Sequence, residues 1–539
     1  MQAYRLTINR FLDHAAKWFS DREVVTGEGD GARRGVSYAA LRARSGRLSG
    51  ALATLGLKFG DRIGALAWNT QHHLELYYAA MGAGLVCHTL NPRVTAEHLA
   101  AMINEADERV LAFAANLAPL AAQILPLCPR LEHLIVLDAP PPTDLAHGPA
   151  KVWAYEQFLA ERGAAAAWGD FPEETPAGLC YTSGTTGRPK GVLYTHRSNY
   201  LHTIRALQAD AFAFTARDAV LCAVPMFHAN GWGIPFAAPA VGAKLVLPGR
   251  QADGASLARL IREEGVTVAV GVQTVWLGVA DHLDAEGGEL PSLERVIIGG
   301  SYCPEALIRR LEQRLGCSVQ TSWGMTELSP LGTVSPPDAG QGGARASGRP
   351  AMGVDIKLTD ADGATLPQQR ETIGHLKVRG ASILDRYFLA DEDVLDAEGY
   401  FDTGDLASLD AEGNLTIRGR SKDLIKSGGE WINPSEIEVI VGRDPRIAQV
   451  AVIAQPHPRW GERPLLIVEP CQGQAITDVE VLGLLRGKVA DWWLPDRVVQ
   501  VTAMPLAATG KIDKMKLRAD FGGDSGLFEG VGADQGSTR

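Results

Sequence analysis

Hydroxyl side chains, glycines and two cations crowd into residues 181–192, which read Tyr-Thr-Ser-Gly-Thr-Thr-Gly-Arg-Pro-Lys-Gly-Val. Apolar runs at 177–180 and 192–194 flank this stretch, which predicts a loop joining two strands. Glycines let the backbone turn its N–H groups toward an anion, hydroxyls add donors, and Lys190 supplies a positive charge. We predict a polyphosphate cradle, although the Walker spacing Gly-x-x-x-x-Gly-Lys-Ser/Thr is absent. A polar surface turn is the plainer alternative.

The residues expected to hold the phosphates are Thr182, Ser183, Gly184, Thr185, Thr186, Gly187 and Lys190. Thr186 is also expected to act in catalysis, and Thr182 to help hold a metal ion.

A second chemical cluster, Ser322 to Glu327, combines an indole, a glycine, hydroxyls and a carboxylate. Trp323 offers a flat face for a purine, and Glu327 offers the oxygen that Mg²⁺ prefers. A core position for Trp323 and a helix-start role for Glu327 are the alternatives. Their occurrence together after a predicted strand favours a nucleotide site.

Two further residues could complete nucleotide chemistry. Asp405 follows a predicted tight turn, and a carboxylate can accept hydrogen bonds from both hydroxyls of a ribose. The alternative is that its side chain only stabilises the turn, as an Asp in a turn usually does. Lys511 lies in a predicted exposed loop, where most lysines have no specific role. A carboxylate that attacks an α-phosphate must approach another anion, at a cost of ~4 kcal/mol for unit charges about 4 Å apart near a protein surface. A lysine that bridges both groups would offset that repulsion.

Composition narrows the functional classes. The 539 residues allow several domains, and 46% hydrophobic residues allow a large core. The formal net charge of -11 argues against a general nucleic-acid binder. Seven cysteines without a Cys-x-x-Cys pair suggest reduced thiols in a cytoplasmic protein. The first residues predict an amphipathic helix over 1–19 rather than a signal peptide, and no apolar run reaches the ~20 residues of a membrane span.

Apolar strands alternate with helical stretches in two regions, which predicts an α/β fold with parallel sheets. In the first region we expect strands at 62–67, 86–89 and 110–113, with helices at 74–81, 96–105 and 117–127. Residues 144–171 look like a less regular connection. In the second we expect strands at 219–224, 244–247, 267–270, 293–298 and 318–321. Ligands bind beyond the carboxyl ends of such strands, where 226–228, 299–301 and 322–327 fall.

The pattern of predicted secondary structure changes after residue 344. Short alternating strands with Asp/Gly turns predict a β-rich subdomain over 344–420, and a smaller α+β unit follows with a strand at 448–454 and a helix at 479–489. The expected domains are 1–420, with the ATP and acyl sites, a mobile 421–521, and a disordered tail at 522–539.

Together, residues 181–192, 322–327, 400–405 and 419–423 resemble the signature motifs of the adenylate-forming superfamily. The segment His-Ala-Asn-Gly-Trp-Gly at 228–233 is similar to its acyl-CoA ligase branch, with the medium- and long-chain fatty acid and methylmercaptopropionate CoA ligases. The resemblance covers about 24–517. It implies a large N-terminal domain of two α/β subdomains plus a β-rich one, a small mobile α+β C-terminal domain, and the use of ATP, Mg²⁺ and coenzyme A.

The resemblance assigns roles around the nucleotide. It implies that Asp405 and Arg420 lie near the ribose, that Lys422 is the hinge, that Lys426 contacts the adenylate, and that Lys511 is the adenylation lysine. Further expected ATP or AMP contacts are Gly300, Ser301, Ser322, Trp323, Gly324, Met325 and Thr326. The expected coenzyme A contacts are Ser427, Gly428, Gly429, Glu430 and Trp431.

On the acyl side, His228 would flank the carboxylate as a catalytic residue and Trp232 would gate the pocket, although a lone His is more often structural. The expected lining is His228, Trp232, Gly233, Gln273, Gly299, Tyr302 and Met325. Gln273, Tyr302 and Trp323 are bulkier or more polar than is usual for a long-chain tunnel. A short or medium acyl chain, or a compact aryl or thioether acid, is therefore predicted.

These observations predict a ligase that joins a carboxylic acid to coenzyme A through an acyl adenylate. The resemblance also implies a homodimer, since the fatty-acyl branch often forms homodimers. A carrier-protein or oxygen acceptor is one alternative. A nucleotide-binding regulator without catalysis is the other, and the presence of Lys190, Glu327 and Lys511 disfavours it.

Overall fold

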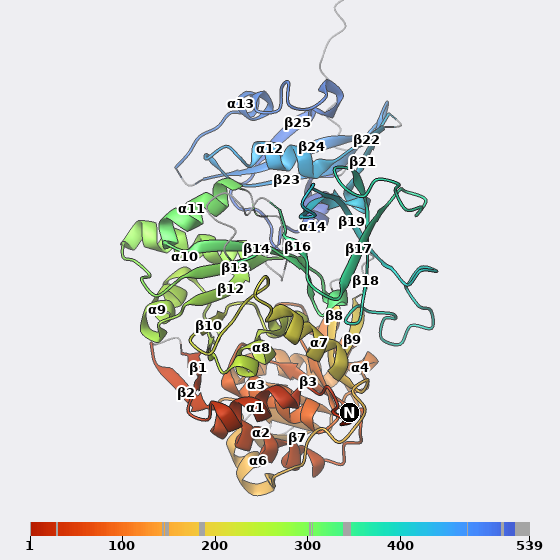
Figure 1. Ribbon diagram of the computed structural model, residues 1–539. Helices are drawn as coiled ribbons and strands as arrows, with labels where there is room; N and C mark the ends of the chain where they lie inside the picture. Colours follow the sequence, from red (N-terminus) through yellow and green to blue (C-terminus); the bar gives the residue numbers. More distant parts are fainter. Residues whose placement is uncertain are drawn as a thin grey trace, which may run out of the picture. The chain divides into compact units, whose positions relative to one another are not determined.

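The computed structural model describes residues 2–28, 31–142, 145, 150–182, 189–300, 303, 305–337, 346–428, 430–471, 473–507 and 511–522. The chain divides into two compact units (Figure 1). Unit 1 is Met1–Thr403 with Ser408–Ile417, and unit 2 is Gly404–Ala407 with Arg418–Arg539. The predicted tail beyond Gly522 lies outside the described residues.

The first sheet of unit 1 has the strand order β7-β6-β5-β3-β4-β8-β9. Its strands are β3 (Arg62–Leu66), β4 (Val86–Thr89), β5 (Val110–Phe113), β6 (His133–Val136), β7 (Lys151–Ala154), β8 (Pro176–Thr182) and β9 (Lys190–Thr195). Neighbouring strands are parallel except β8 and β9, which form an antiparallel pair. Every residue of β4 and β5 is buried, as expected when helices cover both faces of a parallel sheet.

Separate core clusters cover the two faces of this sheet. One face packs against α2 (Tyr38–Ala53) and α3 (Gln71–Gly82), and the other against α4 (Ala96–Glu105) and α5 (Ala118–Ile124). Hydroxyl caps fix where several helices start. The Thr70 side chain accepts from the His73 amide at the start of α3, and Thr95 accepts from His98 at the start of α4. Each such cap contributes about 1 kcal/mol.

The second sheet has the order β16-β15-β14-β13-β12-β10-β11-β1-β2. Its strands are β1 (Glu23–Gly27), β2 (Arg33–Ser37), β10 (Ala219–Cys222), β11 (Lys244–Leu247), β12 (Val268–Val272), β13 (Arg295–Gly299), β14 (Ser318–Gly324), β15 (Leu331–Val334) and β16 (Arg349–Pro350). Helices α9 (Gly254–Glu264), α10 (Gln273–Glu286) and α11 (Glu305–Leu315) lie along one side of it (Figure 1). Remaining helices of unit 1 are α1 (Asn9–Trp18), α6 (Tyr155–Arg162), α7 (His196–Ala206) and α8 (Ile234–Val241).

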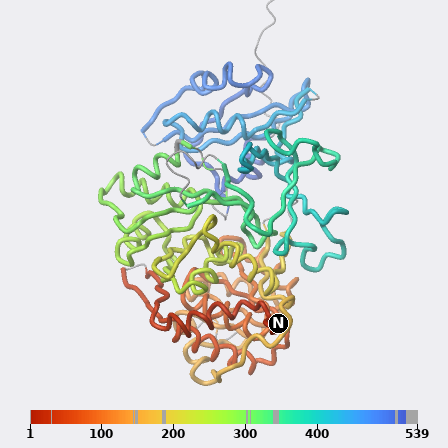
Figure 2. The backbone as a smooth tube through the Cα atoms, in the orientation of Figure 1, coloured from red at the N-terminus to blue at the C-terminus, as the bar shows by residue number. Residues whose placement is uncertain are grey.

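A four-stranded sheet, β17-β18-β19-β20, follows in the chain. Its strands are β17 (Val354–Thr359), β18 (Ile373–Gly380), β19 (Phe401–Leu409) and β20 (Leu415–Arg420). This confirms a β-rich region after residue 344. The backbone tube of Figure 2 lets the reader follow this change from the helix-rich red, orange and light-green segments into the strand-rich blue-green one.

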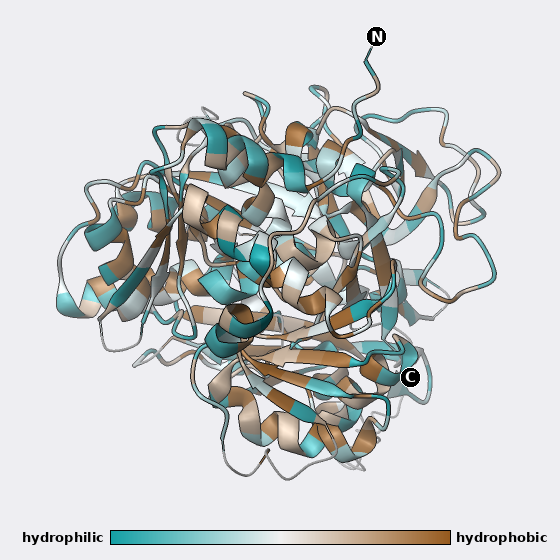
Figure 3. Ribbon diagram, turned by 90° about the horizontal axis from the view of Figure 1, so that it is seen from below, coloured by the Kyte–Doolittle hydropathy of each residue, from teal (hydrophilic) through white to brown (hydrophobic). Residues whose placement is uncertain are grey.

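Unit 2 has its own sheet in the order β22-β21-β24-β23, with β25 beside β24. The elements are β21 (Ile425–Ser427), β22 (Glu430–Ile432), α12 (Pro434–Val441), β23 (Ile447–His457), β24 (Gly461–Pro470), α13 (Asp478–Gly483), β25 (Arg497–Gln500) and α14 (Lys514–Phe521). Apolar residues from β23, β24 and α12 form its core. Over the chain as a whole, Figure 3 shows many strands in brown or tan, whereas several helices carry teal residues on part of their surface.

The predicted α/β fold is confirmed, with local corrections. The first helix covers only Asn9–Trp18, and α13 stops at Gly483 rather than 489. The stretch 144–171 contains β7 and α6, which the sequence did not indicate. Ser322, Trp323 and Gly324 belong to β14 rather than following it, because β15 pairs with them in antiparallel register. Among the described residues, no helix combines the length and apolar character needed to span a bilayer.

Candidate active site

The predicted phosphate loop joins an antiparallel pair of strands, as expected. Thr182 at the end of β8 is the register partner of Lys190 at the start of β9. Because the two residues face each other across the pair, β8 and β9 form a β-hairpin. Ser183, Gly184, Thr185, Thr186 and Gly187, which were predicted to hold phosphates, lie outside the described residues.

Several predicted site residues gather at one edge of the second sheet. The parallel strands β10, β12, β13 and β14 end at this edge, with Val272 paired to Gly299 and Ile298 to Thr321. Gln273 follows β12 directly, Gly300 follows β13 with a φ of 87°, and Ser322 donates to the Ile298 carbonyl at 3.2 Å. Ser301 and Tyr302, the next residues along, are not among those described.

Glu327 lies in a short helical turn, Thr326–Leu328, just after β14. Its side chain is 6% exposed, and one carboxylate oxygen accepts a 2.9 Å hydrogen bond from the hydroxyl of Tyr387. The Lys190 ammonium lies 4.9 Å from the centre of the Tyr387 ring. Burial, followed by the Glu327 charge, raises the pKa of the Tyr387 phenol, so the phenol stays protonated and donates. Lys190 and Glu327 therefore contact the same side chain, that of Tyr387.

Hydrogen bonds tie the hairpin to the Glu327 turn. The Tyr194 hydroxyl of β9 donates to the Thr326 carbonyl at 2.9 Å. The Cys180 sulfur of β8 accepts the Ala229 amide at 3.3 Å, which ties the same hairpin to the loop after β10. Burial raises the pKa of Cys180 to about 11, and the Glu327 carboxylate adds to that rise. The structure thus brings Lys190, Glu327 and the loop that carries His228 into one neighbourhood.

The loop after β10 contains an unusual left-handed turn, Ala229–Gly233. All its residues have positive φ, from 44° at Ala229 to 74° at Gly233. Positive φ costs of order 1–3 kcal/mol for a residue other than glycine, and such strain clusters at functional sites. A Cβ on Gly233 would lie 2.7 Å from the His202 ring, so only glycine fits there. His228 precedes the turn and is half-buried, at the position predicted to flank a carboxylate.

Trp232 of this turn packs on the last residue of β13. The indole is 9% exposed, and a Cβ added to Gly299 would lie 2.9 Å from its Cη2 atom and 2.6 Å from Ser322 Oγ. Trp232, Gly299 and Ser322 thus form one continuous wall. Trp232 and Gly299 were expected on the acyl side, and Ser322 was expected beside the nucleotide. Gln273 contributes a buried Oε1 for which the described residues offer no hydrogen-bond partner.

The contact at Gly299 makes a testable prediction. Gly299→Ala should force Trp232 or Ser322 to move, because both contacts are far shorter than a real Cβ tolerates. We expect kcat/KM for the acid to fall about tenfold or more, since a single misplaced methyl group changes pocket binding by that much. Steady-state kinetics measure kcat/KM, and the melting temperature shows whether the substitution also destabilises the fold. The control is Gly278→Ala on α10, where the nearest atom to an added Cβ is 3.9 Å away. An unchanged kcat/KM in Gly299→Ala would contradict this wall.

The Trp323 indole is partly used in packing. An added Cβ on Gly332 of β15 would lie 2.4 Å from its Cζ3 atom, so the edge of the ring rests on that glycine. A bulge in the β14–β15 register falls between Trp323 and Gly324. An added Cβ on Gly324 would be 2.2 Å from the Pro330 carbonyl oxygen, which explains the glycine. Trp323 and Met325 are each half-buried.

The remaining nucleotide-site candidates lie in unit 2. Arg420 Nε is 2.9 Å from Asp405 Oδ1, so the two residues predicted near a ribose form an ion pair. Lys422 follows in a short turn, Ser421–Asp423, and Asp423 pairs with Arg518 of α14 at 2.6 Å.

The predicted coenzyme A contacts form a hairpin in unit 2. Lys426 pairs with Trp431, and Ser427 with Glu430, across β21 and β22. The Lys426 ammonium lies 5.5 Å from the Trp431 ring centre. Gly428 has a φ of 62° and donates its amide to the Trp460 carbonyl at 2.8 Å. Gly429 lies outside the part of the chain that is described.

The donor set fits magnesium held mainly by a nucleotide. No cluster of three or more His, Cys, Asp or Glu residues that could bind a metal occurs in the described ranges. Magnesium in nucleotide enzymes is usually bound by one or two protein oxygens plus phosphates. The Glu327 carboxylate, almost buried beside the hairpin that carries Thr182, suits that arrangement.

Sequence reasoning missed Tyr387, Tyr194 and Cys180. Each acts through a contact that is distant in the chain, such as the 2.9 Å bond from Tyr387 to Glu327 across 60 positions. No local pattern marks these residues.

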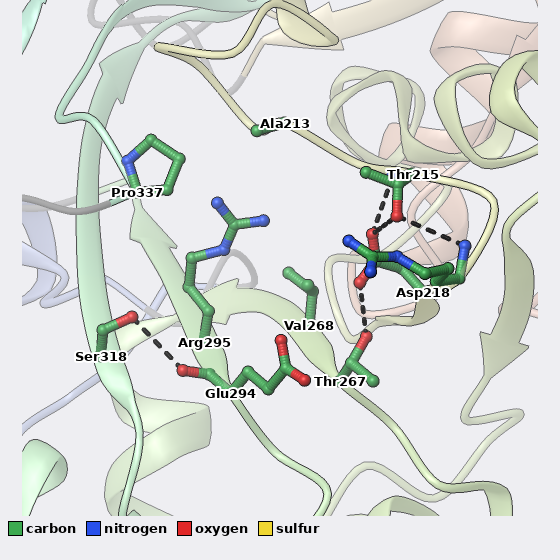
Figure 4. A pocket seen from close by; sticks show the side chains of 10 residues that line it. Ala213, Thr215, Asp218, Thr267, Val268, Glu294, Arg295, Ser318 and Pro337 are labelled. Carbon is green, nitrogen blue, oxygen red and sulfur yellow. Dashed lines mark hydrogen bonds between the residues drawn. The ribbon is translucent and has the colours of Figure 1, made fainter.

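A separate cavity of about 580 Å³ lies at the opposite edge of the second sheet, where β10, β12, β13 and β14 begin (Figure 4). Two of the charged side chains that line it, Asp218 and Arg295, make hydrogen bonds to neighbouring segments. Asp218 accepts from the Thr215 amide at 2.7 Å and from the Thr267 hydroxyl at 2.8 Å, and Arg295 donates to the Phe212 carbonyl at 2.7 Å. These bonds fasten the connection before β10 to the sheet. The cavity is therefore distinct from the site described above.

Comparison with known proteins agrees with this geometry. The profile of the AMP-binding enzyme family matches residues 12–388, and that of the AMP-binding enzyme C-terminal domain matches 436–511. The chain is 44% identical to a 3-methylmercaptopropionyl-CoA ligase of Ruegeria lacuscaerulensis, over 97% of this chain and 98% of the relative. It is 40% identical to a medium-chain-fatty-acid–CoA ligase of Ectopseudomonas oleovorans, over 97% of each. In fold it resembles the anthranilate CoA ligase AuaEII in complex with anthranoyl-AMP, with a TM-score of 0.86 at 22% identity over 96% of this chain and 98% of that one.

Proposed function

The chain belongs to the AMP-binding enzyme family and is an ATP-dependent, AMP-forming acyl-CoA ligase; from this premise we propose which acid it takes and which residues serve each step. The observation that carries the proposal is the shared neighbourhood of Lys190, Glu327 and the Ala229–Gly233 turn. It places a cation and a carboxylate suited to nucleotide chemistry beside a wall suited to an acyl chain.

In the first half-reaction, an oxygen of the acid attacks the α-phosphorus of ATP, and the bond to the β-phosphate breaks to release pyrophosphate. Lys190 and the hairpin amides and hydroxyls hold the phosphates, and His228 flanks the attacking carboxylate. Magnesium, held by Glu327 and Thr182, would neutralise phosphate charge when bound. Lys511 bridges the two anions as they approach.

In the second half-reaction, the coenzyme A thiolate attacks the carbonyl carbon and AMP leaves. We propose that unit 2 turns about Lys422 between the steps, so that the β21–β22 hairpin replaces Lys511 at the reacting carbon. Asp405 and Arg420 keep hold of the ribose. The protein is proposed to work as a homodimer in the cytoplasm.

The acid is proposed to be short or medium in length, or a compact thioether. Trp232 closes over Gly299, and Gln273 places a buried amide oxygen at the same edge. A buried polar atom disfavours a long alkyl chain, which offers it no hydrogen bond. Ligases of similar identity include a methylmercaptopropionyl, a medium-chain and a long-chain enzyme, so the choice among these acids rests on the residues of the pocket.

A screen of acids tests this proposal. Coenzyme A-dependent AMP release should be measured with straight-chain acids from propionate to palmitate, with branched and aryl acids, and with 3-(methylthio)propionate. We expect the highest kcat/KM for short or medium chains or for the thioether acid. A maximum at palmitate would contradict the narrow pocket.

Two arms of the same screen address the alternatives. Replacing coenzyme A with a phosphopantetheinyl carrier protein tests the other acceptor, and a higher rate with the carrier would overturn coenzyme A as acceptor. ATP–pyrophosphate exchange tests the non-catalytic regulator. Absence of exchange with every acid would favour that alternative.

A further inference from the structure

Tyr387 contacts both the Glu327 carboxylate and the Lys190 ammonium, two groups that the proposed reaction needs. Its hydroxyl donates to Glu327 Oε1 at 2.9 Å, and its ring lies 4.9 Å from the Lys190 ammonium. The side chain is half-buried, so solvent reaches it only in part. A single side chain thus contacts both the carboxylate proposed to hold magnesium and the cation proposed to hold phosphate.

The backbone around Tyr387 is fixed from both sides. The Leu384 amide donates to the Glu327 carbonyl at 2.8 Å, and the Phe388 amide donates to the Gly191 carbonyl at 2.8 Å. Phe388 also packs beside Leu179 in a small core cluster. The segment 384–388 therefore bridges the Glu327 turn and strand β9, and the position of Tyr387 follows both.

We propose that Tyr387 is a positioning residue that orients the Glu327 carboxylate toward the metal–nucleotide complex and holds Lys190 beside it. This inference rests on the proposed function, because it assumes that Glu327 and Lys190 serve ATP. It adds a residue whose role comes from its contacts rather than from any motif.

The hydroxyl and the ring have separable roles. The hydrogen bond sets how the carboxylate is turned, since a phenol that donates to one oxygen fixes the rotation about the last side-chain bond. The ring face attracts the ammonium through its quadrupole. Removing only the hydroxyl should therefore disturb metal binding, and removing the ring as well should also weaken the hold on Lys190.

The variants Tyr387→Phe and Tyr387→Leu separate these roles, and Tyr194→Phe is the matched control. Tyr194 also donates a 2.9 Å phenol bond to the same turn, but to the Thr326 main-chain carbonyl rather than to a carboxylate. Both Phe variants lose one hydrogen bond to Thr326–Leu328. Only the Tyr387 change removes a hydrogen bond to the Glu327 carboxylate.

The first measurement is direct binding of Mn²⁺, followed by electron paramagnetic resonance, in the presence of α,β-methylene-ATP. We expect Tyr387→Phe to weaken Mn²⁺ binding about tenfold, the lower end of what loss of an outer partner of a metal ligand costs. Tyr387→Leu should weaken it equally and also raise the Kd of the metal-free analogue about threefold, through loss of the cation–π contact. Tyr194→Phe should lower the melting temperature while leaving Mn²⁺ binding unchanged.

The second measurement is the Mg²⁺ dependence of ATP–pyrophosphate exchange, with the unaltered enzyme as reference. Acid-dependent exchange in the unaltered enzyme establishes the adenylation step on which the proposed function rests, and its absence would contradict that function rather than the role of Tyr387. If the unaltered enzyme exchanges but Tyr387→Phe shows the same Mg²⁺ and Mn²⁺ profiles, the positioning role is overturned. Equal weakening in Tyr194→Phe would also overturn it, since any loosening of the turn would then suffice.

Discussion

Lys511→Ala is expected to lower the rate of acyl-adenylate formation by about 10²–10³, the typical cost of removing one preorganised group that stabilises transition-state charge. The transfer of the acyl group from a supplied acyl adenylate to coenzyme A should stay close to that of the unaltered enzyme. The two half-reactions separate because only the first brings two anions together.

The placement of Lys511 in unit 2 supports this expectation. Its carbonyl accepts the Ala507 amide at 2.7 Å, and the next residue, Ile512, bridges to Leu506. Leu517 of α14 is fully buried in the unit core. The main chain of Lys511 is thus hydrogen-bonded, while its side chain is exposed to solvent. A long flexible side chain on a held main chain suits a cation that is delivered to one step and withdrawn from the next.

The two half-reactions should be measured apart, as pyrophosphate release with acid and ATP, and as thioester formation from synthetic acyl adenylate. Lys516→Ala is the control, because Lys516 is an exposed lysine on the neighbouring helix whose pair with Asp520 at 3.4 Å is a surface contact. It should retain both rates. Normal pyrophosphate release in Lys511→Ala would refute the role given to this lysine.

Local sequence patterns predicted those helices and strands whose bounds depend on interactions between residues close together in the chain. The strands Val86–Thr89 and Lys244–Leu247 and the helix Ala96–Glu105 have the predicted bounds, because each is an apolar run or an amphipathic repeat ended by a cap or a turn. The predicted helix at 479–489 is shorter, since α13 ends at Gly483. The N-terminal strand β1 joins the second sheet beside β11, about 220 residues away in the chain, and no local pattern carries that pairing.

The candidate site, like the fold, could be predicted from the sequence only in part. Motif residues such as Glu327 and Lys190 could be proposed from their types and their neighbours in the sequence. The contact that joins them through Tyr387 could not, because it depends on where residues 384–388 return in space. The strain at Ala229 and Trp232 was equally hidden, since alanine and tryptophan rarely adopt a positive φ, whereas asparagine, as at position 230, adopts it more often.

Lys422→Pro is expected to slow thioester formation about tenfold or more, equivalent to at least about 1.4 kcal/mol in the barrier, while adenylation stays near normal. Lys422 lies between two ion pairs of unit 2, Arg420 with Asp405 at 2.9 Å and Asp423 with Arg518 at 2.6 Å. These pairs hold the residues on either side, so we expect the proposed backbone rotation to occur at Ser421 and Lys422. Proline fixes its own φ near −65° and restricts the residue before it, which removes much of that freedom.

Lys422→Ala separates backbone stiffness from loss of charge. It removes the ammonium but leaves φ and ψ free, so it should keep thioester formation close to that of the unaltered enzyme. Rapid-quench measurement of each half-reaction, with acid plus ATP and then with preformed adenylate plus coenzyme A, gives the comparison. An equal loss of both half-reactions in Lys422→Pro would indicate general damage to unit 2 rather than a blocked rotation at this turn.

A loss of thioester formation in Lys422→Ala as large as in Lys422→Pro would assign the effect to the charge. A selective loss in the proline variant alone requires that this turn change conformation between the two chemical steps.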